Sequence, residues 1–357
     1  MPVPTIPPFP DDVPVVPLLV IDYKRIVERD EAEIERLWEA ATKLGFWYLK
    51  NHGADEEVDG MFDMGAETMA LPLEEKKKFA QVDEGIAISF GYKAAGSTAT
   101  DSSGAPDFVE FINISRDDAL SYPTPTHRTY PSTVNARMQV TIRPFIEKSN
   151  EVNDTLIDVL NDRLGLPKGE LARRHDVREK SGSEGRAIRN PPNMAYTAEK
   201  AVLGSHTDFG SLSFLHHHQL GGLQVLPPGS KQWKYVKPVP GHAICNIGDT
   251  LAIFSGGILR SNIHRVVPPP KDQAAHERWS VVFFTRPGES QLLRPLQSES
   301  ALIAEAAKNR PELFTDATAG EWYVRRITNQ RLKNRKGPET WAASRGTEYD
   351  PENDEVY

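Results

Sequence analysis

The order of apolar and polar residues along the chain predicts helices first, a β-rich middle and helices again at the end. Between residues 30 and 44 apolar side chains recur every three or four positions, which places them on one face of a helix, and Gly45 follows to end it. The same period predicts a helix over 136–164. Shorter helical patterns cover about 55–70 and 74–79, and apolar runs predict strands at 18–21 and 46–49.

Beyond about residue 186, short β-prone segments alternate with Gly and Pro turns, a pattern typical of a sandwich or barrel. The predicted strands are 212–215, 223–226, 233–236, 243–246, 250–254 and 279–285. Helical patterns return at 301–308 and 322–332, and we expect the polar tail from about 334 to be mobile. These changes divide the chain into residues 1–185, 186–298 and 299–357, which we expect to form one compact domain.

Composition narrows the function classes. The 357 residues contain 42 Lys and Arg against 50 Asp and Glu, a net charge of −8, which does not favour a nucleic-acid partner. No apolar run approaches the roughly 20 residues needed to span a bilayer, so no membrane partner is expected. A single cysteine, Cys245, suits a reducing compartment. We therefore expect a cytoplasmic protein that acts on a small molecule.

The histidines carry the candidate chemistry. His206 and Asp208 are two residues apart, so in an extended strand both side chains point to one face. His264 begins another strand-like segment 56 positions later. Two imidazoles and one carboxylate form the facial triad of non-haem Fe(II) oxygenases, with open positions for a co-substrate and O₂. On these three residues alone, however, ordinary buried histidines are the better explanation.

A second pair of residues favours a metal site over ordinary buried histidines. Arg278 and Ser280 begin a predicted strand fourteen residues after His264, and their spacing again places both on one face. A guanidinium can hold a carboxylate with two parallel hydrogen bonds, and a hydroxyl can add a third. A surface arginine at the start of a strand would not explain why this pair follows a candidate metal ligand.

The order of these motifs resembles the 2-oxoglutarate- and Fe(II)-dependent dioxygenases of the isopenicillin N synthase-like branch. The C-terminal motifs that carry the resemblance are His206–Asp208, Gly221–Val225, Asn246–Asp249, His264–Val266 and Arg278–Ser280. The N-terminal ones are Leu18–Asp22, Gly45–Gly53, Leu71–Lys76 and Gly91–Tyr92. The resemblance extends from about residue 15 to 290 and continues more weakly into the C-terminal helix.

The resemblance implies a mainly β core with flanking helices, a double-stranded β-helix (jelly roll) of the cupin type. It implies that His206, Asp208 and His264 bind Fe(II), and that Arg278 and Ser280 bind the far carboxylate of 2-oxoglutarate. The implied reaction consumes O₂ and oxidises a C–H bond of a small organic molecule by hydroxylation, desaturation or cyclisation. 2-Oxoglutarate is decarboxylated to succinate in the same reaction.

The remaining candidates are less well defined. Many relatives carry Asn-x-Tyr-Pro before the triad, whereas this chain has Asn193-Met-Ala-Tyr-Thr, so Tyr196 is either a contact of 2-oxoglutarate or a core tyrosine. Phe108 and Glu110 align roughly with a substrate-lining segment, although a half-buried strand is the simpler interpretation. In the tract His216-His217-His218, only His216 is a candidate pocket residue, because consecutive strand residues alternate between faces.

Two alternatives stay open at this point. Some relatives with the same Arg-x-Ser pair, such as isopenicillin N synthase, do not use 2-oxoglutarate, and release of succinate distinguishes them. A catalytically silent jelly roll that binds a small ligand is the other alternative, but such a protein has no need of open metal positions. The sequence does not define the substrate or the oligomeric state.

Overall fold

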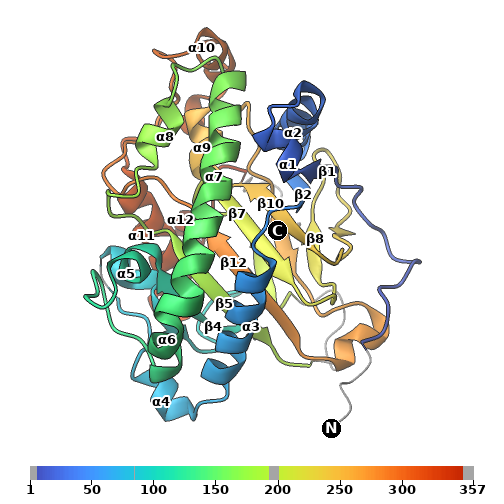
Figure 1. Cartoon of the computed structure of the whole chain (residues 1–357), viewed down its shortest axis with the longest axis vertical. Helices are drawn as coiled ribbons and strands as arrows, with labels where there is room; N and C mark the ends of the chain where they lie inside the picture. The colour runs from blue at the N-terminus through green and yellow to red at the C-terminus, as the bar shows by residue number, and fades with distance from the viewer. Residues whose placement is uncertain (1–5, 84, 193–200, 349–357) are drawn as a thin grey trace.

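The core of the protein is an eight-stranded sheet to which both halves of the chain contribute (Figure 1). The computed structural model describes residues 6–83, 85–192 and 201–348. Neighbouring strands are antiparallel except for β1 and β2. In spatial order the strands are β1 (Val20–Asp22), β2 (Phe46–Lys50), β10 (His242–Ile247), β7 (Leu212–His217), β12 (Arg278–Phe284), β5 (Glu184–Asn190), β4 (Glu110–Ser115) and β3 (Gly91–Lys93).

A second sheet of four antiparallel strands completes the core. Its order is β6 (Leu203–His206), β11 (His264–Val266), β8 (Leu223–Val225) and β9 (Lys234–Tyr235). Residues of both sheets line one cavity. Two facing sheets of mostly antiparallel strands form a jelly roll, which confirms the predicted fold class.

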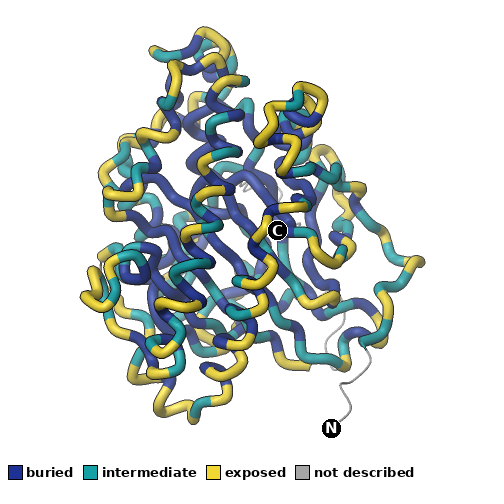
Figure 2. Tube along the Cα trace, in the orientation of Figure 1, coloured by how far each residue is buried: buried dark blue, intermediate teal, exposed yellow. Residues whose placement is uncertain are grey.

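Long helices cover the outer face of the large sheet. Figure 1 shows α3 (Asp55–Met69) and α7 (Arg143–Arg163) lying across it, and Figure 2 shows that the strands behind them are mostly buried. A Cβ atom added at Gly65 of α3 would lie 2.8 Å from the Cβ of Ala187 on β5, so the missing side chain lets this helix approach the sheet closely. No helix of the described ranges is long and apolar enough to span a membrane.

The other helices are short or lie at the edges of the sheets. The N-terminal ones are α1 (Tyr23–Val27), α2 (Glu31–Lys43), α4 (Leu73–Lys77), α5 (Arg116–Ser121), α6 (Ser132–Arg137) and α8 (Glu170–Arg174), and α9 (Asp249–Phe254) lies between β10 and β11. The C-terminal ones are α10 (Ala301–Ala307), α11 (Ala319–Gln330) and α12 (Pro338–Ala343). Within the described ranges, 3₁₀ turns lie at Ile86–Ser89, Lys271–Ala275, Pro311–Leu313 and Leu332–Asn334.

Two predictions of regular secondary structure were wrong. The strand predicted at 250–254 is helix α9, all of whose residues are buried, and a short apolar run cannot by itself distinguish a strand from a buried helix. The single helix predicted over 136–164 is divided by a π-helical turn at Met138–Ile142, just before Pro144. Proline supplies no backbone N–H for a helical hydrogen bond, which favours such an interruption.

The tail predicted to be mobile contains ordered structure. Helix α12 lies within it, and Trp341 on that helix is 3% exposed. Arg345 donates a hydrogen bond of 2.5 Å from Nη1 to the carbonyl oxygen of Ser205 on β6. The composition of this segment is polar, but a few buried side chains attach it to the core.

Candidate active site

The three residues of the predicted triad converge at one end of the cavity. His206 on β6 and His264 on β11 are direct cross-strand partners, which explains how residues far apart in the sequence meet. Each Nε2 atom lies 3.8 Å from Oδ1 of Asp208. One potential ligand atom from each residue lies within 4.8 Å of the other two, so the set could hold one metal ion.

Backbone carbonyls fix the orientation of both imidazoles. Nδ1 of His206 lies 2.8 Å from the carbonyl oxygen of Gly204, and Nδ1 of His264 lies 3.1 Å from that of Asn262. A carbonyl can only accept, so each Nδ1 must carry the proton. Each Nε2 is then left with a lone pair directed toward Asp208, the tautomer that a metal ligand requires.

Asp208 is held from the large sheet. It lies two residues beyond the end of β6 and not on the strand, which differs from the geometry predicted from the sequence. Ser213 on β7 and Asn246 on β10 donate hydrogen bonds of 2.5 and 2.7 Å to its Oδ2. Burial raises the pKa of Asp208, but the positive charge that the two facing imidazoles carry when protonated, together with these donors, outweighs burial and brings the pKa to about 2. Oδ1 therefore remains an ionised ligand atom.

Ser213 gives a testable prediction about this support. Replacing Ser213 with Ala should weaken Fe(II) affinity about tenfold to hundredfold, because partners that orient metal ligands typically contribute that much. Anaerobic titration with Fe(II) measures the change, and Ser298→Ala, at an exposed position, is the matched control. Equal affinities for Ser213→Ala and the control would show that Asn246 alone suffices to orient Asp208.

Arg278 and Ser280 lie side by side on β12 and line the same cavity as the triad. Nη1 of Arg278 donates to Oγ of Ser280 over 2.8 Å, and its Nε donates to the carbonyl oxygen of Gly221 over 2.8 Å. Burial lowers the pKa of Arg278 to about 10, so it is a cation at neutral pH. No described carboxylate lies within ion-pair distance of it. A buried unpaired cation is unfavourable, so this site is suited to an anionic ligand.

The Gly-Gly pair next to Arg278 has a structural reason. Gly222 has a φ of 112°, a conformation that favours glycine. A Cβ atom at this position would lie 2.6 Å from the carbonyl oxygen of Val267 and 3.5 Å from Nε of Arg278. The pair therefore allows the loop to pass close enough for Gly221 to accept from the guanidinium.

The cavity has a volume of about 150 Å³. Residues 107–111, which lead into β4, alternate between facing it and facing away. Asp107, Val109 and Phe111 line the cavity, whereas Phe108 and Glu110, the residues predicted as substrate contacts, do not. Glu110 instead accepts hydrogen bonds from Lys76, Tyr92 and Arg189, at 2.9, 2.7 and 3.1 Å. The sequence placed the right segment at the pocket with its register displaced by one residue, which exchanges the two faces.

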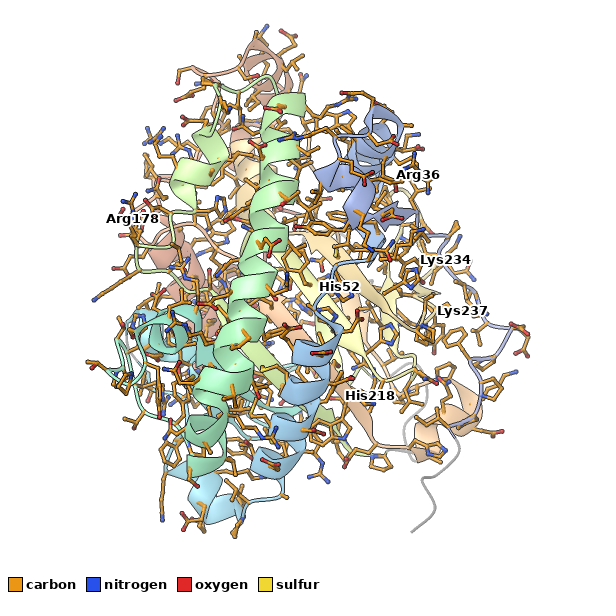
Figure 3. The ribbon with its side chains drawn as sticks, in the orientation of Figure 1. Arg36, His52, Arg178, His218, Lys234 and Lys237 are labelled. Carbon is orange, nitrogen blue, oxygen red and sulfur yellow. The ribbon has the colours of Figure 1, made fainter. Side chains whose placement is uncertain are left out.

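In the histidine tract at the end of β7, His216 faces away from the cavity, whereas the sequence made it a candidate pocket residue. His216 packs edge-on against His52 at 5.1 Å and Phe145 at 6.2 Å, on the helix-covered side of the sheet. Figure 3 shows His52 and His218 on that side, beside α3. The structure does not bring His216 to the cavity. Its neighbour His217 is paired with Ser280 across the strands. Burial and then the charge of Arg278 lower the pKa of His217 to about 3.

Tyr196, the predicted contact of 2-oxoglutarate, lies outside the described residues. A described polar residue beside Arg278 and Ser280 is Asn190, the last residue of β5 and the cross-strand partner of Arg278. Asn190 lines the cavity, and its buried Oδ1 has no hydrogen-bond partner within the described ranges. The dipeptide Pro191-Pro192 directly after it marks the end of a strand, a feature that could have identified this position.

The sequence did not predict that the C-terminal helix supports the triad. Arg326 on α11 is fully buried, forms an ion pair with Asp249 and donates a 3.0 Å hydrogen bond to the carbonyl oxygen of Thr207. Thr207 lies between two triad residues, so this contact fixes the backbone from which both side chains extend. Without the structure, Arg326 looks like an ordinary charged residue on an amphipathic helix.

Comparison with known families matches both halves of the chain. Residues 187–287 match the model of the 2OG-Fe(II) oxygenase superfamily, and residues 17–135 match that of the non-haem dioxygenase in morphine synthesis N-terminal. The first range contains the triad, Arg278 and Ser280.

Individual proteins are also similar to this chain. A 2-oxoglutarate-dependent dioxygenase of Dothideomycetidae sp. is 32% identical over 275 residues, which cover 75% of this chain and 81% of that protein. One from Aspergillus fumigatus is 28% identical over 347 residues, covering 90% and 88%. A full-length Neurospora crassa protein in complex with alpha-KG has a similar fold, with a TM-score of 0.71 and 24% identity over 89% of this chain and 97% of that one.

Proposed function

The chain belongs to the 2OG-Fe(II) oxygenase superfamily, and from this premise we propose that His206, Asp208 and His264 bind its Fe(II) and that Arg278 and Ser280 bind 2-oxoglutarate. The protein is a dioxygenase that oxidises a substrate and decarboxylates 2-oxoglutarate to succinate. The observation that supports the assignment of residues best is the buried Arg278, which has no described carboxylate partner and lines the same cavity as the triad.

Each residue then has a defined task. Iron held by the three triad residues would supply the activation of O₂ that the oxidation of a C–H bond requires. His206 and His264 present Nε2 because their Nδ1 protons are held by carbonyls, and Asp208 presents Oδ1 because Oδ2 is occupied by two donors. Arg278 and Ser280 orient the co-substrate through its far carboxylate. The apolar walls of the cavity, among them Phe46 and Leu215, exclude water from the reacting groups.

The same premise supports a small organic substrate. The Neurospora crassa protein has been solved with alpha-KG and thymine, and with alpha-KG and 5-formyluracil. The cavity of this chain is lined by both apolar and polar side chains, as the binding of a small organic molecule requires. We propose that the protein works in the cytoplasm, where a reducing environment keeps iron as Fe(II) and suits its single buried cysteine, Cys245.

A two-stage experiment tests the proposed function. Anaerobic addition of Fe(II) and 2-oxoglutarate should produce a visible charge-transfer band, because a chelating keto acid on Fe(II) absorbs in this range. Admission of O₂ should then release succinate, with His206→Ala as the inactive control. A parent protein that forms no band and releases no succinate would contradict the use of 2-oxoglutarate.

A further inference from the structure

The cavity contains a second cationic group that lies apart from Arg278. Along β5 alternate residues face the cavity, so Arg186, Ile188 and Asn190 all line it. Asn190 is opposite Arg278 and Arg186 is opposite Val282, four residues further along β12. Four strand residues span roughly 13 Å. Arg186 therefore lies too far along the strand to share the carboxylate that Arg278 is suited to bind.

The charges around Arg186 do not balance. Glu184, which is fully buried, accepts from Nη2 of Arg186 at 2.9 Å and from Nη2 of Arg286 at 3.2 Å. The next cation of the cavity, Lys93, has a carboxylate of its own in Asp107. Two guanidiniums thus share one carboxylate, which leaves one positive charge uncompensated. Nε of Arg286 is buried and has no hydrogen-bond partner among the described residues.

Arg186 is also held with one edge free. Its Nε donates to Oδ1 of Asn113 at 2.6 Å and its Nη2 to Glu184, while its Nη1 bonds no described residue. The rings of Phe111 and Phe284 lie 4.1 and 4.7 Å from the guanidinium carbon. The side chain is 16% exposed and lines the cavity. Such fixed placement lowers the conformational entropy that binding a ligand would otherwise cost.

Arg189 on the same strand shows what a purely structural arginine looks like here. Its side chain points to the opposite face, where Nε donates to Glu277 at 2.6 Å and Nη1 to Glu110 at 3.1 Å. This more exposed arginine thus has two carboxylates near it. The more buried Arg186, for which an unpaired charge is more costly, shares only one. A structural network would be expected to show the reverse.

We propose that Arg186 binds a carboxylate of the substrate, so that the substrates of this oxygenase are small organic acids with an apolar body. The inference rests on the proposed function, because it assigns the substrate of that same cavity. A single uncompensated charge matches a monoanion and suits a carboxylate better than a phosphate dianion. Val109, Phe111 and Val282 supply apolar walls of the cavity that Arg186 and the triad both line. The acid group thus fixes which carbon of the substrate faces the metal ligands.

Binding of matched acids and amides tests this inference. The full chain is loaded anaerobically with Fe(II) and 2-oxoglutarate, which fills the Arg278 site, and is titrated calorimetrically. The probes are 3-phenylpropanoate, 4-phenylbutanoate and octanoate, each beside its primary amide. At least one acid should bind the parent about tenfold or more tightly than its amide, since a charge-assisted hydrogen bond contributes this much.

The variants decide which residue causes the preference. Arg186→Met should bind that acid no more tightly than the amide, whereas Arg189→Met should keep the preference of the parent. The charge-transfer band reports whether each variant is folded. Should Arg186→Met fail to fold, Arg186→Gln, which can still hydrogen-bond Asn113, replaces it with the same expected result.

Two results would overturn the inference. One is an unchanged acid preference in the neutral Arg186 variant, and the other is a parent that binds none of the acids more tightly than its amide. Neither result affects the proposed function, because the heat of binding is measured without turnover. Failure of the proposed function is recognised separately, as a parent protein that forms no charge-transfer band with 2-oxoglutarate.

Discussion

Replacing His264 with Ala removes iron binding and turnover while the protein remains folded. Only the Nε2 atom of His206 and one oxygen of Asp208 would then face the metal, and two ligands without the third hold Fe(II) poorly. The fold should survive, because the cross-strand pairing of β11 with β6 and β8 depends on backbone groups. Iron content after anaerobic desalting and succinate release measure the effect.

Two comparisons make that result specific. His276→Ala removes a histidine that does not line the cavity and should retain iron and activity. Far-UV circular dichroism and the thermal midpoint show whether His264→Ala is folded, which is a real question because His264 is 7% exposed and packs edge-on against Phe46 at 5.3 Å. If His264→Ala and His206→Ala both retain stoichiometric iron, the assignment of the triad is wrong.

The residues proposed to bind iron and 2-oxoglutarate could be found from the sequence because the order of their motifs resembles that of a known oxygenase family. His206 and Asp208 are two positions apart in the chain, and so are Arg278 and Ser280. What the sequence could not show is how these patterns meet. The two motifs come together because His206 pairs directly with His264 across the strands. The hydrogen bond from Ser213 to Asp208 then connects this site to the large sheet.

The errors at the substrate end have a common cause. Phe108 and Glu110 lie one position away from residues that line the cavity, and His216 lies beside His217, which pairs with Ser280. The side-chain period of a strand is two, so an error of one residue exchanges its faces. A single sequence locates a strand more readily than it fixes the register, and the register decides which residues meet the substrate.

Strand β5, which carries Arg186, shows a different limit of prediction from sequence. Strand β5 was not predicted, because its sequence, Glu-Gly-Arg-Ala-Ile-Arg-Asn, contains three charged residues and a glycine among few apolar ones. Those charges are tolerated because Glu184 lies between two guanidiniums and the outward Arg189 bonds Glu277 and Glu110. Arg286 follows β12, Glu277 precedes it and Glu110 lies on β4, so the sequence of β5 alone does not reveal the imbalance of charge.

Replacing Arg278 with Leu should weaken the binding of 2-oxoglutarate about tenfold to hundredfold and leave iron occupancy near that of the parent. Loss of a charge-assisted contact costs on the order of 1.5–3 kcal/mol, and about 1.4 kcal/mol corresponds to tenfold. The triad is unaffected, since none of its ligand atoms contacts Arg278. The dependence of the charge-transfer band on 2-oxoglutarate concentration measures the change, and Arg189→Leu is the matched control.

The order of effects between Arg278 and Ser280 provides the sharper test. Ser280→Ala removes one neutral donor and should weaken 2-oxoglutarate less than Arg278→Leu does, because a neutral hydrogen bond contributes about half as much as a charge-assisted one. Ser280 also accepts from Nη1 of Arg278 over 2.8 Å, so its loss leaves the guanidinium less well oriented but still charged. An equal or larger effect of Ser280→Ala would mean that orientation of Arg278, more than its charge, determines affinity. An unchanged affinity in Arg278→Leu would place the carboxylate clamp elsewhere in the cavity, and Asn190, its cross-strand partner, would then be the next residue to replace.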